Sequence, residues 1–410
     1  MTLDMKFVES QFPALRGREF VYLDNAGGSL VLQGVADRVR DFLLTTSVQH
    51  GATYSKSQQG MARVAAAQQS VMRLINASRP EEVVMGPSTT ALLRILAVAV
   101  GETLSPGDEI IASVSEHEAN YGSWELLKRK GIKIVRWPIE PDGYRLDPQR
   151  LASLMTERTK LVCCTHASNI LGTINPIREF ADIAHAHGAK ICVDGVAYAP
   201  HRLVDVRALD VDYYVFSFYK VYGPHHAVLY GRYEDLVALP GQNHFFIEPT
   251  RTPYKFQPGN VNYELAYGCM GINEYLVDLA RRSGEVHEDE RAAMGAAFDL
   301  ISAQEEVVCR RLLDFLNGVP SVKIIGEKTA DAGLRVPTVS FTVNNRSSAE
   351  IVSAIDPYNI GIRYGDFYAR RLAEHIGLQK EDGVVRVSMV HYNTIEEIDR
   401  LVERLAPLLN

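Results

Sequence analysis

Residues 213–224 read YYVFSFYKVYGP, an apolar strand-like run that leads to Lys220 and then to a Tyr-Gly-Pro turn. Such surroundings hydrate a lysine poorly, and loss of water favours the neutral amine. The neutral amine is the nucleophile that condenses with an aldehyde to form a Schiff base. Taken alone, Lys220 is more simply interpreted as a lysine that caps a loop. Other segments of the chain are needed to choose between this interpretation and a Schiff-base lysine.

A second apolar run, AKICV at residues 189–193, ends directly in Asp194. We expect a central parallel strand here, and the carboxyl ends of such strands face the crevice in which ligands bind. An aspartate at that position could keep a pyridine nitrogen protonated, so that the ring drains electrons from a carbanion. A strand followed by aspartate is common, but it becomes specific when the next strand ends in Ser217-x-x-Lys220.

The third informative segment is GPSTT at residues 86–90, between the apolar run 83–85 and the helical stretch ALLRILAVAV. Free backbone N–H groups and hydroxyls at a helix N-terminus form an anion site that suits a phosphate. An ordinary Ser/Thr helix cap is the alternative for this segment alone.

Together these segments resemble the class V aminotransferase family of pyridoxal phosphate (PLP) enzymes of fold type I, most closely its cysteine desulfurase and selenocysteine lyase branch. The likeness covers most of the chain, and its motifs are VYLDNAGGS, STTALL, SEHEAN, THASNILGTINPI, VDGVAYAPH, DYYVFSFYKVYGP, KFQPGNVN, GIRYGDFYA and VVRVSMVHYNT. It implies the α/β architecture of that fold type, with PLP as cofactor. It also implies an amino-acid substrate and a homodimer with shared active sites.

Carried over by position, the resemblance makes Lys220 the Schiff-base lysine, Asp194 the partner of the pyridinium and His117 the imidazole stacked on the cofactor ring. Asn169 would touch both cofactor and substrate. The phosphate ligands would be Thr89, Thr90, Ser217 and Tyr219, with Tyr219 standing where relatives commonly have histidine.

Three further positions complete the expected site. Asn260 in QPGN would reach a phosphate across the dimer interface. Arg386 would clamp the substrate carboxylate, because its planar guanidinium can bind both oxygens. Arg363 is a second substrate-binding candidate. Structural alternatives stay open at this point, since His117 could cap a loop, Asn169 could form a turn and Arg386 could lie beside an edge strand.

The chain also departs from the desulfurase pattern. Desulfurases carry a persulfide-forming cysteine shortly after an Arg-x-Gly segment, whereas residues 363–369 read RYGDFYA and contain no cysteine. Ala197 replaces a glutamine that bonds the cofactor's phenolic oxygen. Phe218, Tyr219, Phe367 and Tyr368 make the expected pocket bulkier and more apolar, which favours a substrate larger than cysteine.

These features favour a PLP-dependent, desulfurase-like carbon–sulfur lyase that lacks the loop cysteine. Release of Lys220 by the substrate amine would free it to remove the α proton, and the resulting carbanion can lead to elimination, transamination or epimerisation. A class V aminotransferase or an amino-acid epimerase is therefore the alternative. The alternative that is not an enzyme is a PLP-binding regulatory or scaffold protein.

Composition limits the classes of partner. The 43 Lys and Arg residues against 50 Asp and Glu give a net charge of −7 without a basic run, so we expect no nucleic-acid partner. The N-terminal residues MTLDMKFVESQFP have neither a basic leader nor an apolar core, and no apolar run approaches the ~20 residues of a membrane span. We expect a cytoplasmic protein with five reduced cysteines, and no metal site, since no paired ligand spacing is present.

The pattern of apolar runs predicts how the chain is organised. Strand-like runs alternate with helical stretches between about residues 83 and 231, which indicates a mostly parallel, seven-stranded sheet in a large domain at residues 17–265. We expect a smaller α+β domain from residues 1–16 and 266–410, with a long helix that bridges the two. An N-terminal helix at about residues 2–11 is expected to pack with the small domain.

Overall fold

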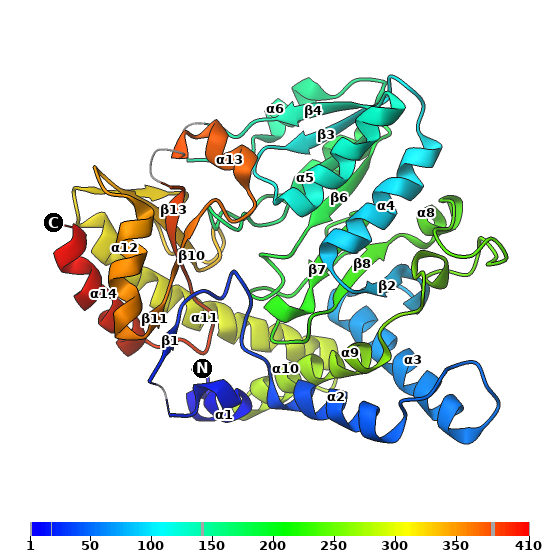
Figure 1. Cartoon of the computed structure of the whole chain (residues 1–410), viewed down its shortest axis with the longest axis horizontal. Helices are drawn as coiled ribbons and strands as arrows, with labels where there is room; N and C mark the ends of the chain where they lie inside the picture. Colours follow the sequence, from blue (N-terminus) through cyan, green and yellow to red (C-terminus); the bar gives the residue numbers. More distant parts are fainter. Residues whose placement is uncertain (1, 18, 141–142, 379–381, 410) are drawn as a thin grey trace.

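The computed structural model describes residues 2–17, 19–140, 143–378 and 382–409. A larger and a smaller lobe lie at opposite ends of an elongated molecule, and each is built on its own sheet (Figure 1). Most of the functional residues expected from the sequence lie in the larger lobe, at strand ends, at the start of a helix and on loops.

Seven strands form the central sheet of the larger lobe, and every neighbouring pair is parallel except those of β8, which is antiparallel to both β2 and β7. In spatial order they are β2 (Val83–Gly86), β8 (Ala227–Gly231), β7 (Tyr213–Ser217), β6 (Lys190–Asp194), β5 (Thr159–Thr165), β3 (Glu109–Ser113) and β4 (Lys133–Trp137). This confirms the mostly parallel, seven-stranded sheet.

Alternate residues of these strands enter two different cores, one on each face of the sheet. Within β6, for example, Ile191 and Val193 belong to one hydrophobic cluster and Cys192 to the other. Because both faces are covered, the strands are continuous apolar runs without a polar side. The covering helices are α2 (Gln33–Thr45), α3 (Ser55–Ile75), α4 (Thr89–Thr103), α5 (Glu118–Glu125), α6 (Pro148–Leu154), α7 (Ile177–Ala186), α8 (Tyr233–Ala238), α9 (Tyr263–Gly268) and α10 (Met270–Arg282).

The smaller lobe is an antiparallel sheet with helices packed against it. Its sheet has the order β12 (Arg363–Gly365), β13 (Val384–Ser388), β10 (Thr338–Val343) and β9 (Val322–Ile325). The helices packed against it are α12 (Ser348–Ile355) and α14 (Ile395–Leu409), whereas α13 (Arg370–His375), between β12 and β13, buries Leu372 and Ala373 in the larger core. A short parallel pair, β1 (Val21–Tyr22) with β11 (Ile360–Gly361), ties the start of the chain to this lobe.

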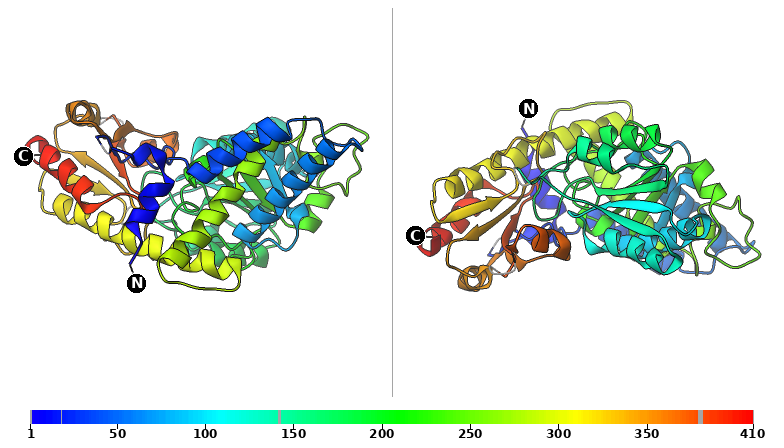
Figure 2. Two further views of the ribbon diagram at one scale, coloured as in Figure 1. Left: turned by 90° about the horizontal axis from the view of Figure 1, so that it is seen from below. Right: turned by 90° about the horizontal axis from the view of Figure 1, so that it is seen from above.

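A single long helix, α11 (Glu290–Asn317), runs from one lobe into the other (Figure 2). It begins at Asp289, whose side chain accepts a hydrogen bond from the backbone N–H of Ala292, a standard N-terminal cap. Its first half, including Phe298, packs in the larger core, and its second half, including Leu312, packs in the smaller core.

Two N-terminal segments pack differently from the sequence expectation. Val21 and Leu23 belong to the core of the smaller lobe, whereas Val8 of α1 (Met5–Gln11) and Phe12 belong to the larger core. Phe12 lies edge-on to Tyr275 of α10, with ring centroids 5.6 Å apart. A short amphipathic helix can pack against any apolar surface that lies near it in the fold. Its own sequence does not indicate which of the two cores that surface belongs to. The domain limits proposed above stay a prediction.

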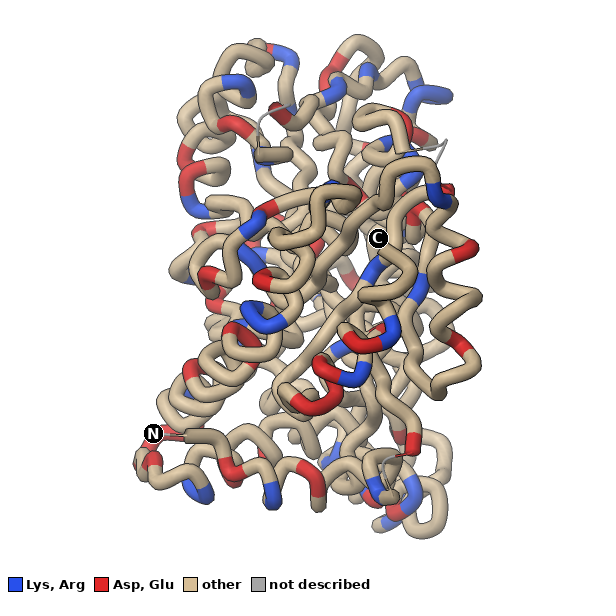
Figure 3. The backbone as a smooth tube through the Cα atoms, turned by 90° about the vertical axis from the view of Figure 1, so that its left-hand side faces the viewer, with Lys and Arg blue, Asp and Glu red and all other residues tan. Residues whose placement is uncertain are grey.

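Basic and acidic residues alternate along the backbone over the side shown in Figure 3. Helix α14 is typical, since Asp399 and Glu403 share it with Arg400 and Arg404. Within the described ranges, every helix is too short or too polar to cross a bilayer.

The two lobes meet at a glycine. Gly172, in the loop after β5, has φ +70°, and a Cβ built on it would lie 2.4 Å from the carbonyl oxygen of Thr338 in β10. Its own carbonyl accepts a hydrogen bond from the backbone N–H of Val336 at 2.9 Å. Only glycine allows both this left-handed conformation and this approach of backbone to backbone.

We therefore expect Gly172→Ala to lower the free energy of unfolding by about 3 kcal/mol, through backbone strain together with a steric clash. Gly188→Ala is the matched control, because Gly188 has nearly the same φ (+71°) but open space around it. That control should cost only ~1 kcal/mol. Chemical denaturation of both variants measures the difference, and equal losses would contradict a tight junction between the lobes.

Candidate functional site

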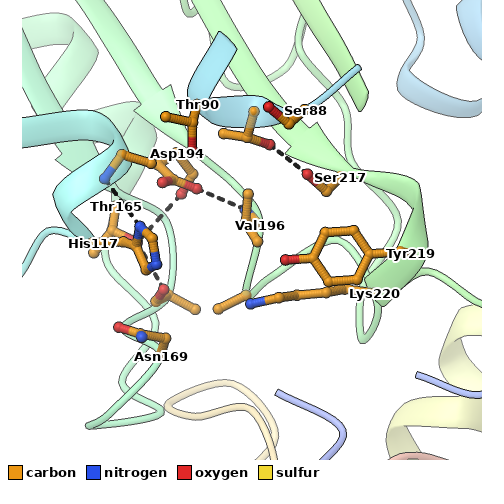
Figure 4. A pocket seen from close by; sticks show the side chains of 14 residues that line it. Ser88, Thr90, His117, Thr165, Asn169, Asp194, Val196, Ser217, Tyr219 and Lys220 are labelled. Atoms are coloured by element: carbon orange, nitrogen blue, oxygen red, sulfur yellow. Dashed lines mark hydrogen bonds between the residues drawn. The ribbon is translucent and has the colours of Figure 1, made fainter. Parts of the chain in front are cut away.

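A pocket opens at the carboxyl ends of β5, β6 and β7 in the larger lobe, where ligands bind in open α/β sheets. It encloses about 540 Å³, open solvent included. It brings together most of the residues singled out from the sequence, namely Thr89, Thr90, His117, Asn169, Asp194, Ser217, Tyr219 and Lys220 (Figure 4). Ala197 lies on its wall.

Lys220 closes a short 3-10 turn that follows β7, and only 7% of its surface is exposed. The pKa of its amine is lowered to about 8, mainly by burial and also by the positive charge of Arg386, while Asp194 and Asp24 act in the opposite direction. A substantial share of the amine is therefore neutral near pH 8, which is the nucleophilic state.

Asp194 is the last residue of β6, and its buried carboxylate accepts a hydrogen bond from the backbone N–H of Val196 at 2.9 Å. Burial raises its pKa to about 6, opposed by that hydrogen bond and by the charge of Lys220. The carboxylate is thus ionised at neutral pH, on the floor of the pocket.

His117 is the N-cap of α5, and its Nδ1 accepts a hydrogen bond from the backbone N–H of Ala119 at 3.0 Å. This bond leaves the proton of the neutral ring on Nε2. Burial lowers the pKa of His117 to about 4, and the charges of Lys220 and Arg386 add to that shift. His117 therefore does act as a cap, as the structural alternative in the sequence analysis predicted. It also lines the pocket.

One end of the pocket is built from hydroxyl groups at the N-terminus of α4. The side chain of Ser88 caps this helix, and Thr89 Oγ1 lies 2.7 Å from Ser217 Oγ (Figure 4). Thr90 lines the same end. The positive end of the α4 dipole and these donors fit a phosphate group.

A second pocket adjoins the first and shares His117, Asn169, Tyr219 and Lys220 with it. Arg363 and Arg386 line this second pocket, and the smaller lobe supplies both. The two lobes therefore build the candidate site together.

Arg386 is held in place from several sides. Its Nη2 donates to Asp24 Oδ1 at 2.8 Å, its Nη1 donates to the carbonyl of Asn169 at 3.2 Å, and the Phe367 ring centroid lies 3.6 Å from its Cζ. Its buried Nε has no hydrogen-bond partner within the part of the chain that the structure describes. Asp24 also reaches Arg363 at 3.5 Å. Arg386 lines the second pocket, and its planar guanidinium fits an incoming carboxylate.

The loop after β12 closes over these groups. The carbonyl of Phe367 accepts a hydrogen bond from Asn169 Nδ2 at 2.9 Å, and that of Tyr368 accepts one from the backbone N–H of Glu118 at 2.7 Å. Phe367 and Tyr368 have φ values of +48° and +60°, a left-handed conformation that is strained for aromatic residues. The loop is thus pinned to the larger lobe.

The comparisons with known proteins identify the family. The model of the family described as aminotransferase class-V matches residues 21–401. The chain belongs to the class V aminotransferase family. Members of this family and cysteine desulfurases use PLP, and the hydroxyl-lined helix N-terminus, strand-end carboxylate and buried lysine found here fit that cofactor. The chain is a PLP-dependent, cysteine desulfurase-like enzyme.

Several curated relatives match almost the whole of this class V chain. An aminotransferase-like protein of Gibberella zeae is 40% identical, over 98% of each chain. A cysteine desulfurase-like protein of Aspergillus flavus is 36% identical, over 97% of this chain and 88% of its own. A cysteine desulfurase of Serratia proteamaculans is 32% identical, over 99% and 98%.

Solved structures confirm the fold. The crystal structure of a cysteine desulfurase from Escherichia coli, in an S-sulfonic acid form, superposes with a TM-score of 0.85 at 27% identity and full coverage of both chains. The cysteine desulfurase of Thermococcus onnurineus gives a TM-score of 0.87 at 24% identity, over 100% of this chain and 98% of that one, which supports the fold alone.

No thiol of this class V enzyme is placed to react at the site. All five cysteines are free and buried, and burial raises the pKa of each. A buried thiol with a raised pKa is a poor nucleophile.

Sequence reasoning missed two residues of the site. Asp24 stands in the quoted motif VYLDNAGGS, but its partner Arg386 is 362 residues away, so no local pattern joins them. Glu116, next to His117, is buried with its carboxyl bonded to Asn120 Nδ2 at 2.7 Å. Asn260 is exposed on the loop before α9 and outside both pockets, so its expected role stays a prediction.

The Asp24–Arg386 pair predicts a stability effect. Asp24→Asn leaves the charge of Arg386 buried without a counterion, which should lower the free energy of unfolding by about 3 kcal/mol. The matched control is Asp182→Asn, which removes an exposed carboxylate paired with Arg178 and should cost less than about 1 kcal/mol. Denaturant titrations of both variants test this, and a loss for Asp24→Asn no greater than for the control would contradict it.

Proposed function

We propose that the chain acts on an amino-acid substrate as a desulfurase-like carbon–sulfur lyase, with Lys220 as the residue that holds the cofactor covalently. The observation that carries this proposal is the convergence of a buried lysine, a strand-end carboxylate and a carboxylate-binding arginine on two joined pockets. When bound, PLP supplies the electron sink that stabilises negative charge on the substrate's α carbon.

In this proposal the residues divide the work by location. With PLP bound, its phosphate would be held by Thr89, Thr90, Ser217 and Tyr219, Asp194 would balance a protonated pyridine nitrogen, and His117 would contact the ring. Asp194 suits its role because its carboxylate is ionised at neutral pH and can balance a protonated nitrogen.

The substrate carboxylate lies on Arg386, with Arg363 beside it. Asn169 links the two regions, because its carbonyl accepts from Arg386 while its amide donates to the loop that covers the site. Phe367 stacks on the guanidinium and excludes water from it, which strengthens the attraction between arginine and carboxylate.

Lys220 would be the base that removes the α proton of the substrate, and the lowered pKa of its amine suits that task. His117 has a different role in proton transfer. A histidine that is neutral at neutral pH must first take up a proton before it can give one to a leaving group. The negative charges of a bound phosphate and carboxylate would raise its pKa toward that range.

A sulfur-containing leaving group without a protein persulfide is the specific part of the proposal. The covering loop, RYGDFYA, has aromatic residues and no thiol, and the five cysteines are buried elsewhere. Sulfur would then leave as a small molecule, or as part of a leaving group that is larger than the thiol of cysteine.

We also propose a cytoplasmic homodimer. Asn260 is exposed and lies outside both pockets of its own subunit, the position required of a residue that acts in a neighbouring one. Five unpaired thiols fit a reducing compartment.

The decisive experiment incubates the pure enzyme with a panel of amino acids that includes cysteine and its S-conjugates. Cofactor absorbance is followed, and products are analysed. Release of sulfide, thiol or pyruvate is expected. Stable conversion of the cofactor to its amine form would instead establish transamination, and inversion at the α carbon would establish an epimerase.

Lys220→Ala tests the covalent role. We expect borohydride to attach the cofactor to the wild type but not to this variant, and turnover to fall by roughly 10³-fold, with partial recovery on addition of a small primary amine. The matched control is Lys255→Ala, another buried lysine, whose Nζ donates to the backbone carbonyl of Leu239 at 2.6 Å outside the pocket. Full turnover of Lys220→Ala without added amine would refute the assignment.

A further inference from the structure

Tyr222, two residues after Lys220, adopts a backbone conformation that its side chain disfavours. Its φ is +61°, in the left-handed region that a bulky residue rarely occupies. Such a conformation persists only where the surrounding structure holds it. The contacts that hold Tyr222 therefore also hold the turn that carries Lys220.

The side chain of Tyr222 is fully buried in an aromatic cluster. The rings of Phe12, Tyr275 and His391 lie edge-on to it, with centroids 5.7, 6.3 and 4.9 Å away. Its hydroxyl donates a hydrogen bond to the backbone carbonyl of Pro200 at 2.7 Å. These partners come from the N-terminal segment, α10, the segment after β13 and the loop after β6. One side chain thus ties the turn to four separate parts of the chain.

The hydrogen bonds on either side of His391 have one consistent direction. The pKa of His391 is lowered to about 3, mainly by burial and also by His201, so its ring is neutral and carries one proton. The Tyr222 hydroxyl gives its only proton to Pro200, so it must accept from His391 Nδ1, which lies 3.2 Å away. Nε2 is then left to accept from the hydroxyl of Tyr275 at 2.6 Å. The two middle groups of this chain each donate once and accept once, which holds the Tyr222 hydroxyl in a single orientation.

Ser29 holds the same turn through its backbone. The Ser29 hydroxyl accepts a hydrogen bond from the backbone N–H of Tyr222 at 2.8 Å and donates one to the carbonyl of Tyr219 at 3.2 Å. Tyr219 and Tyr222 lie on either side of Lys220 in the sequence, so one hydroxyl bridges the two flanks of the lysine. The backbone N–H of Ser29 also donates to Tyr219 at 3.0 Å, and that of Leu32 donates to the carbonyl of Tyr222 at 3.0 Å. Residues 29–32 thus fix the path of the backbone before and after Lys220.

We propose that Tyr222 and Ser29 are positioning residues, which fix the direction in which Lys220 enters the first pocket. Both lie outside that pocket and so act on the lysine through the backbone of its turn. This inference rests on the proposed function, in which Lys220 holds the cofactor covalently. An amine that forms such a bond has to be held near the geometry of the reaction, and a small displacement slows the reaction strongly.

Two conservative substitutions separate this role from ordinary packing. Tyr222→Phe keeps the aromatic ring and removes the bonds to Pro200 and His391. Ser29→Ala removes the bridge across the lysine. The matched control is Tyr275→Phe, which removes a buried hydroxyl that bonds the same histidine at its other nitrogen.

Hydrogen exchange of the full-length enzyme without cofactor gives the first readout. The backbone N–H groups of residues 218–223 should exchange about tenfold faster in Tyr222→Phe and in Ser29→Ala than in the wild type, because each variant loses hydrogen bonds that restrain the turn. Tyr275→Phe should exchange there at the wild-type rate. Unchanged exchange in either test variant would remove that residue from the proposal.

Uptake of the cofactor gives the second readout. After PLP is added to the cofactor-free enzyme, the visible absorbance of the Schiff base should appear about tenfold more slowly in the two test variants, and at the wild-type rate in Tyr275→Phe. Turnover per bound cofactor should fall by a similar factor. KM should change little, because Arg386 is untouched.

Faster exchange combined with wild-type rates of cofactor uptake and turnover would overturn the proposal, since the two side chains would then only stabilise the turn. Failure of the proposed function would look different, because the wild type itself would then take up no cofactor.

Discussion

The removal of a few charged groups from water at the carboxyl edge of one sheet is the constraint on which the site depends. Lys220, Asp194 and Glu116 are all nearly inaccessible there, and burial is the largest cause of each pKa shift. In water these groups would be an ammonium and two carboxylates. Inside the fold, burial shifts the amine toward its neutral form and raises the pKa of both carboxyl groups. The sheet therefore selects protonation states as well as positions.

The smaller lobe contributes the arginine side chains that line the site. Arg386 comes from β13, its counterion Asp24 follows β1, and both segments are joined to the smaller sheet and not to the larger. The loop that carries Phe367 and Tyr368 is bonded across to Asn169 and Glu118. The charge balance of the pocket is thus shared between two cores, and a change in their relative placement would alter the electrostatics and the access together.

The sequence predicted those parts of the molecule that follow from local pattern and from parallel topology. Apolar runs that end in Asp194 and in Ser217-x-x-Lys220 had to bring these side chains to one edge, because parallel strands end on the same side. Family resemblance supplied His117, Asn169 and the two arginines.

Contacts between distant segments could not be predicted in this way. Asp24 meets Arg386 only because the chain folds, and this pairing leaves no periodic trace in the sequence. The left-handed conformations of Phe367 and Tyr368 contradict local preference, since aromatic residues rarely adopt them, and hydrogen bonds to the other lobe maintain them. The packing of Val8 and Val21 likewise depends on which apolar surface lies nearest.

Helix α11 has a consequence for how the molecule comes apart. With 28 residues it extends over roughly 42 Å, and its two halves are inserted in different cores. If either lobe unfolded, one half of α11 would lose its packing contacts. Because the backbone hydrogen bonds of the helix are continuous, this would destabilise the other half as well. The two lobes should therefore denature in a single cooperative transition, and neither is expected to survive if the chain is cut within α11.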